Sequence, residues 1–98
     1  MADAPYVHVT AAAGLPAVVD AVWKANRVAL DTETTGLNPR KDRVRLLSTH
    51  DGRATYLIDL FAINPVALAP LFKVMAGTTL ILHNAQFDLG MLRQQLGQ

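Results

Sequence analysis

The sequence predicts an α/β domain in which an antiparallel meander plus one parallel strand form a mixed sheet with flanking helices. Two observations lead to this prediction. Short apolar runs that end in turn residues alternate with stretches in which apolar residues recur at helical spacing. The chain has 98 residues, and 51% of them are hydrophobic, which suits one small domain over residues 1–98.

The first 60 residues contain a strand, a helix and the meander. Alternating apolar residues predict a short strand at residues 6–10, and apolar residues at helical spacing predict a helix over residues 15–23. Trp23 belongs to the apolar stripe of this helix, so we expect it in the core. The meander should consist of strands at residues 27–31, 44–49 and 54–59.

The rest of the chain supplies one more strand between two helices. Asn64 followed by Pro65 is typical of a helix start, and Pro70 should interrupt the helix that follows. Residues 78–82 form an apolar strand that returns through this helix. It should therefore lie parallel to, and beside, the strand at residues 27–31. A last helix is expected after it.

Composition excludes several classes of protein and site. The chain has no cysteine, so disulfides and thiolate metal sites are excluded. No apolar run approaches the roughly 18 residues of a membrane span, and the N-terminus lacks the features of a signal peptide, so we expect a cytoplasmic protein. The net charge is only +1, so nucleic acid would have to bind through a local site.

Carboxylates follow two of the expected strands. Asp31 and Glu33 come directly after an apolar run and, being two residues apart, share one face of a strand. Asp88 lies in the first turn of the last helix, one turn after Asn84. If the two strands are parallel neighbours, these groups meet at one edge of the sheet, where ligands gather. Oxygen-only ligands suit Mg²⁺ or Mn²⁺, and two such ions about 3.5–4 Å apart can promote phosphodiester hydrolysis.

Each of these features alone has a simpler interpretation. Two acidic residues at a strand end are usually solvated, and an asparagine near a helix start is usually a cap. Their convergence after two neighbouring apolar strands favours a metal site. A basic cluster follows the first motif, and we interpret it as a solvated surface rather than a nucleic-acid contact; it comprises Arg40, Lys41, Arg43 and Arg45.

The motifs at residues 31–37 (DTETTGL) and 83–88 (HNAQFD) resemble the first two motifs of the DEDD-type 3′–5′ exonucleases. With the hairpin signal at Asp51-Gly52 between them, the chain is similar over almost its whole length to the proofreading domain of family A DNA polymerases. The resemblance implies a ribonuclease-H-like fold and removal of nucleotides from single-stranded DNA 3′ ends. Ribonuclease-D-like RNA exonucleases share these motifs and are the competing assignment.

The resemblance also implies roles for the residues of the site. Asp31 would bridge two metal ions, Mg²⁺ or Mn²⁺. Glu33 would complete the tighter metal site, and Asp88 would hold the second ion. The residues implied in substrate binding are Thr34 and Leu37, at the terminal nucleotide, and Asn84.

One part of the family pattern is missing. These exonucleases take a fourth carboxylate from a later helix, preceded by a Tyr or His that orients the attacking water, but no acidic residue follows Asp88. We therefore expect a C-terminally truncated domain, inactive or weak alone, whose partner is the missing C-terminal half or a polymerase domain. The alternative is a non-catalytic remnant or assembly fragment. Truncation would expose the strand at residues 78–82, through which we expect self-association.

Overall fold

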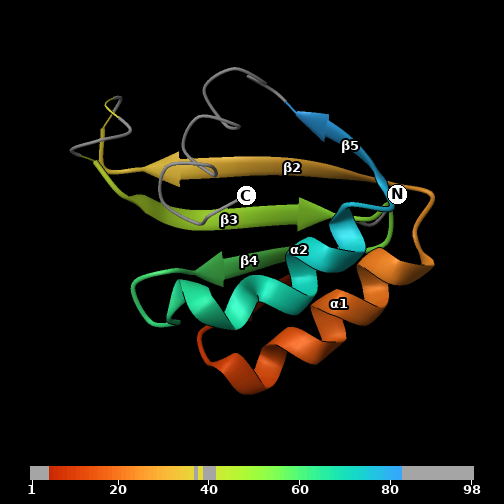
Figure 1. The fold of residues 1–98 in the computed structure, drawn as a ribbon, viewed down its shortest axis with the longest axis horizontal. Coiled ribbons are helices and arrows are strands. Elements are labelled where there is room, and N and C mark those ends of the chain that lie inside the picture. Colours follow the sequence, from red (N-terminus) through yellow and green to blue (C-terminus); the bar gives the residue numbers. More distant parts are fainter. Residues whose placement is uncertain (1–4, 37, 39–41, 83–98) are drawn as a thin grey trace.

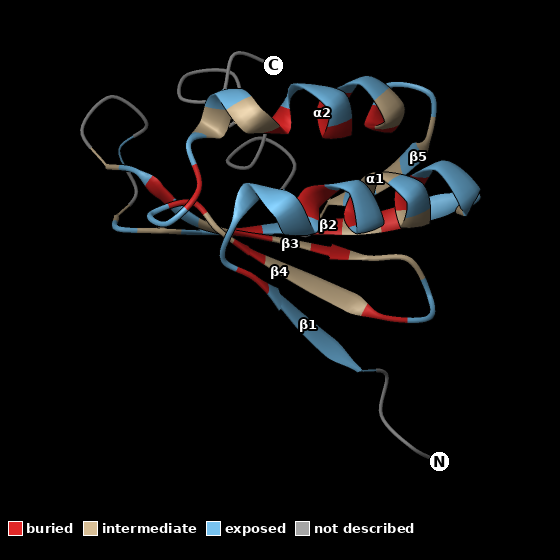
Figure 2. Cartoon of the chain, turned by 90° about the horizontal axis from the view of Figure 1, so that it is seen from below, coloured by how far each residue is buried: buried red, intermediate tan, exposed pale blue. Residues whose placement is uncertain are grey.

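The computed structural model describes residues 5–36, 38 and 42–82. This part of the chain forms a five-stranded mixed sheet, and two helices cover one face of it (Figures 1 and 2). The strand order is β1-β4-β3-β2-β5. The strands are β1 (Tyr6–Val9), β2 (Arg27–Thr34), β3 (Val44–His50), β4 (Thr55–Asp59) and β5 (Thr79–Leu82).

The expected pairing of the central strands is confirmed. Strands β2, β3 and β4 form an antiparallel meander. Strand β5 lies parallel to β2, with Leu82 opposite Leu30. Strand β1 extends the sheet at the other edge, parallel to β4, a placement that the sequence pattern did not predict. Strand β2 runs to Thr34, three residues beyond its expected end, so both acidic residues of the first motif lie within the strand.

Helix α1 (Leu15–Lys24) follows a 3-10 turn, η1 (Ala12–Gly14). Helix α2 (Ala69–Met75) also begins from a 3-10 segment, η2 (Pro65–Leu68). The Asn64 side chain caps η2 by accepting a hydrogen bond of 3.0 Å from the backbone N–H of Val66, as predicted. The predicted interruption at Pro70 is confirmed, because this residue lies in the first turn of a helix that restarts there.

The core lies between the sheet and the two helices (Figure 2). Val18 and Val22 of α1 are fully buried, and so are Leu47 of β3 and Ile58 of β4. Burying one such side chain contributes about 1.5–3 kcal/mol. None of the helices in the described ranges is long and apolar enough to cross a membrane.

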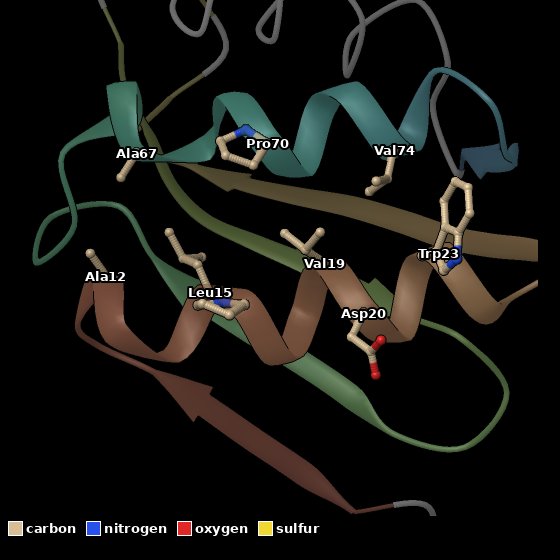
Figure 3. A pocket seen from close by; sticks show the side chains of 9 residues that line it. Ala12, Leu15, Val19, Asp20, Trp23, Ala67, Pro70 and Val74 are labelled. Carbon is tan, nitrogen blue, oxygen red and sulfur yellow. The ribbon is translucent and has the colours of Figure 1, made fainter.

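The prediction that Trp23 lies in the core is wrong, because 74% of its surface is exposed. It lines an apolar groove of about 530 Å³ between α1 and α2, with Val19 and Val74 among its neighbours (Figure 3). The reason is geometric. Val18 and Val22 lie on the face of α1 that is buried in the core, and α2 packs beside this helix. Trp23 lies in the last turn of α1, at the edge of the apolar stripe, and this edge stays outside the core.

Candidate active site

The two carboxylates of the first motif lie on the face of the sheet opposite to the helices. Along β2, the buried residues Leu30 and Thr32 alternate with the exposed residues Asp31 and Glu33. Because successive strand residues point to opposite faces, the buried pair fixes the direction of the acidic pair. The structure thus confirms that Asp31 and Glu33 share one face, as their spacing predicted.

Asp31 lies on β2, one residue beyond the part of this strand that pairs with β5. Its Oδ1 accepts a hydrogen bond of 2.9 Å from the backbone N–H of Thr32, and its cross-strand partner on β3 is Ser48. It also borders a hollow of about 400 Å³ on this face, lined in addition by Ala29, Leu30, Ser48, His50 and Ile81. The carboxylate is therefore open to a ligand from the side of the sheet that α1 and α2 leave uncovered.

Glu33 is held by an arginine from the neighbouring strand. Its Oε2 lies 2.7 Å from Nη2 of Arg45, and both side chains are about half exposed, 55% for Glu33 and 51% for Arg45. The ladder between β2 and β3 shifts register here, since Glu33 pairs with Leu46 and Thr34 with Val44. Arg45 is thus the extra residue of a bulge, and such bulges redirect side chains near functional sites. Sequence reasoning missed this pair, because residues twelve apart in the chain give no local signal.

Several hydrogen bonds hold together the loop that follows Glu33, between β2 and β3. The Thr34 hydroxyl donates to the carbonyl of Gly36. The backbone N–H of Thr35 donates to the carbonyl of Arg43, and the Thr35 hydroxyl accepts from the Arg43 N–H, both at 2.9 Å. The Asp42 carboxylate accepts from the Asn38 N–H at 3.0 Å. These bonds close the loop between β2 and β3 next to the acidic pair.

Three of the predicted site residues lie outside the described part of the chain: Leu37, Asn84 and Asp88. The structure does describe the strand that leads to the second motif. Leu82, the last residue of β5, lies beside Leu30, the residue that precedes Asp31. Within the described ranges, no group of three or more potential metal ligands comes together.

Two other acidic residues, Asp51 and Asp59, have structural roles. Asp51 accepts hydrogen bonds from the backbone N–H groups of Arg53 and Ala54 in the turn between β3 and β4. Asp59 accepts from the N–H groups of Phe61 and Ala62 at the end of β4. Neither carboxylate lies next to Asp31 in the sheet. Asp51 comes after the end of β3, and Asp59 is the last residue of β4, a strand that does not pair with β2.

Two observations refine the interpretation of the basic cluster. The guanidinium of Arg43 stacks over the ring of Phe61, 4.8 Å from its centroid. Arg45 contacts Glu33, as described above. Arg40 and Lys41 lie outside the described residues. Arg43 and Arg45 are exposed, as the interpretation of the cluster as a solvated surface requires, and each also has a specific partner.

Comparison with known proteins decides the family. The family model described as 3′–5′ exonuclease matches residues 6–98. The chain belongs to this family. DNA polymerase I of Aquifex aeolicus (strain VF5) is 36% identical over 87 residues, which is 89% of this chain and 14% of the polymerase. The exonuclease chain thus spans about one seventh of the length of this relative.

Solved structures support the same fold. Escherichia coli RNase D, an exoribonuclease involved in structured RNA processing, matches with a TM-score of 0.82 and 26% identity, over 95% of the exonuclease chain and 25% of its own. Trypanosoma brucei RNase D, solved in complex with RNA U12, matches with a TM-score of 0.84 and 18% identity, over 97% and 35%. The fold is therefore ribonuclease-H-like, as the resemblance of the motifs implied. Exonucleases of this family generally depend on a divalent metal.

Proposed function

We propose that the exonuclease chain carries the first part of a DEDD-type, two-metal active site that hydrolyses the terminal phosphodiester of single-stranded DNA 3′ ends, in the manner of a proofreading domain. The observation that carries this proposal is the position of Asp31 and Glu33. They lie on the same open face of β2, and the strand that leads to the second motif ends beside that site. The relationship to a DNA polymerase I favours DNA as the substrate and replication as the context.

The side chains present fit a divalent ion. Asp31 and Glu33 are exposed carboxylates on one face, and hard oxygen ligands are those that Mg²⁺ and Mn²⁺ prefer. We infer that Asp31, Glu33 and Asp88 would hold the metal. When bound, the ions lower the pKa of a water and stabilise charge on the leaving oxygen.

The remaining residues would bind and orient the strand. We infer that Thr34, Leu37 and Asn84 contact the terminal nucleotide. Thr34 follows Glu33 directly, and the hydrogen bonds of the loop between β2 and β3 fix the backbone on both sides of Leu37. Contacts of this kind to a base face and a backbone need no sequence reading, which suits an enzyme that trims any sequence.

A second candidate is an RNA exonuclease of the ribonuclease-D type. It is favoured by the likeness to E. coli RNase D, which at 26% identity extends over 95% of the exonuclease chain. The two candidates share the metal site and differ in the sugar that the site accepts. A third candidate is a non-catalytic remnant or assembly fragment, since no group of three or more potential metal ligands comes together in the described part of the chain.

The test is release of the 3′-terminal nucleotide from a 5′-labelled single strand, in DNA and RNA versions, with Mn²⁺. We expect slow or no trimming by the 98 residues alone. We expect faster trimming when the segment that follows the matched region of A. aeolicus DNA polymerase I is added, because it would supply the fourth carboxylate. Asp31→Asn should abolish trimming in both cases.

Each outcome separates the candidates. Trimming of DNA in preference to RNA supports the proofreading assignment, and the reverse preference supports the ribonuclease-D type. Strong trimming by the 98 residues alone would contradict the need for a fourth carboxylate. No trimming of either strand with the added segment would favour the non-catalytic alternative.

A further inference from the structure

The ion pair between Glu33 and Arg45 places a cation on a carboxylate that the proposed function assigns to a metal. The two groups lie 2.7 Å apart, on adjacent strands. A guanidinium and a divalent ion compete for the same carboxylate oxygens, since each needs their lone pairs. The pair therefore bears directly on how metal enters the site.

The pair is positioned by the backbone rather than by the salt bridge itself. Arg45 is the extra residue of the bulge between β2 and β3, and its carbonyl accepts a hydrogen bond of 3.0 Å from the Leu60 N–H. The side chain of Arg45 is therefore carried to Glu33 by main-chain hydrogen bonds that do not depend on its charge. Changing this side chain should leave the sheet intact.

The pair is also weak enough to be displaced. Both side chains are about half exposed, and solvent screens ion pairs of this kind strongly. The neighbouring Arg43 is stacked on Phe61, 4.8 Å from the ring centroid, so its guanidinium has a different partner. Arg45 is thus the member of the basic cluster that the described structure places on the acidic pair.

We propose that Arg45 is a positioning residue: its guanidinium pairs with Glu33 while the site is free of metal and is displaced when the divalent ion binds. This inference rests on the proposed metal site. The guanidinium holds the Glu33 carboxylate in one position on the open face of β2, and metal binding exchanges one cation for another at Oε2 of Glu33. Arg45 consequently lowers the affinity of the site for metal, because the incoming ion must displace it.

The experiment measures Mn²⁺ affinity by titrating the 98-residue chain and following free Mn²⁺ by electron paramagnetic resonance. Arg45→Gln should bind Mn²⁺ about two- to fivefold more tightly than the parent, the factor expected for loss of a half-exposed competing pair. Arg45→Lys should resemble the parent, because an ammonium still competes. Arg53→Gln is the matched control, since it removes the same charge in the turn between β3 and β4, away from Glu33.

Weaker binding by Arg45→Gln, or a change no larger than that of Arg53→Gln, would overturn the inference. Thermal unfolding without metal shows whether each variant is folded, and a merely structural role would lower the melting temperature without tightening metal binding. Asp31→Asn separates the two proposals. If the parent binds Mn²⁺ and this variant does not, the metal site stands whatever Arg45 does. If both bind alike, the metal site fails and the inference with it.

Discussion

Gly36 lies directly against the carboxylate of Asp42: a Cβ atom on Gly36 would clash with Oδ2 of Asp42. That carboxylate also accepts a hydrogen bond from the Asn38 N–H. In the loop between β2 and β3, a side chain at position 36 therefore fits only if the Asp42 carboxylate moves away. This close approach gives the glycine of the first motif a steric role beside the acidic pair.

Replacing Gly36 with alanine should destabilise the protein. The added methyl group must push the Asp42 carboxylate away from Asn38, and losing a hydrogen bond of this kind costs about 0.5–1.5 kcal/mol. Thermal unfolding should show a melting temperature several degrees lower, as about 4–8 °C per kcal/mol is usual for a domain of this size. Gly77→Ala is the control, because its new Cβ would make an ordinary contact of 3.8 Å with the Val74 carbonyl. Equal stability of the two variants would refute the steric argument.

Asp51 should make stability depend on pH. Partial burial raises the pKa of Asp51, but hydrogen bonds from the N–H groups of Ala54, Arg53 and Asp51 itself, with the charge of His50, outweigh it and lower the pKa. A lowered folded-state pKa stabilises the protein above the unfolded-state value of about 3.9, and this contribution disappears as the pH falls through the folded-state pKa.

The variant for this prediction is Asp51→Asn, which keeps the shape of the turn and removes the charge. Urea unfolding at pH 7 should show the parent to be the more stable. The difference should shrink as the pH is lowered below about 4, where the carboxylate begins to be protonated in the unfolded chain. A difference that stays constant from pH 7 to pH 2.5 would show that the charge of Asp51 contributes nothing.

Trp23→Gln should change stability little, because 74% of the tryptophan surface is exposed. Surface substitutions usually stay within about 0.5 kcal/mol. The neighbouring Val22 is only 1% exposed, so Val22→Ala should cost more, about 1–3 kcal/mol. Chemical unfolding of both variants checks the contrast. A larger loss for Trp23→Gln would restore the original expectation that the tryptophan belongs to the core.

Much of the fold follows from local patterns, and the exceptions have physical causes. Buried and exposed residues alternate along β2, which places Asp31 and Glu33 on the same face. The chain returns through α2 before β5, which predicts that β5 lies parallel to β2 and beside it. Trp23 fits the helical stripe, but a pattern cannot tell how much of the stripe the sheet will cover. The contact of Arg45 with Glu33 depends on a bulge. The consecutive leucines at positions 46 and 47 break the apolar alternation of β3, but this break does not tell which residue of β2 Arg45 will contact.

Self-association through β5 remains a prediction. Among the described strands β5 has one neighbour, β2, and Ile81 is 50% exposed on the face that carries Asp31. A strand edge without charge or proline is a template for pairing. Light scattering over a concentration series should show association of the parent chain and less of Ile81→Lys. Val66→Lys, at a residue 80% exposed in η2, is the control. A parent chain that stays monomeric at high concentration would rule this edge out.

Thermal unfolding with and without Mn²⁺ tests the central claim, that Asp31 and Glu33 form part of a divalent metal site. A ligand that binds only the folded state stabilises it by about 2.7 kcal/mol at one hundred times its dissociation constant. The account predicts that saturating Mn²⁺ raises the melting temperature of the 98-residue chain by several degrees, and that Asp31→Asn removes this response. No rise in the parent, or an equal rise in both proteins, would contradict it.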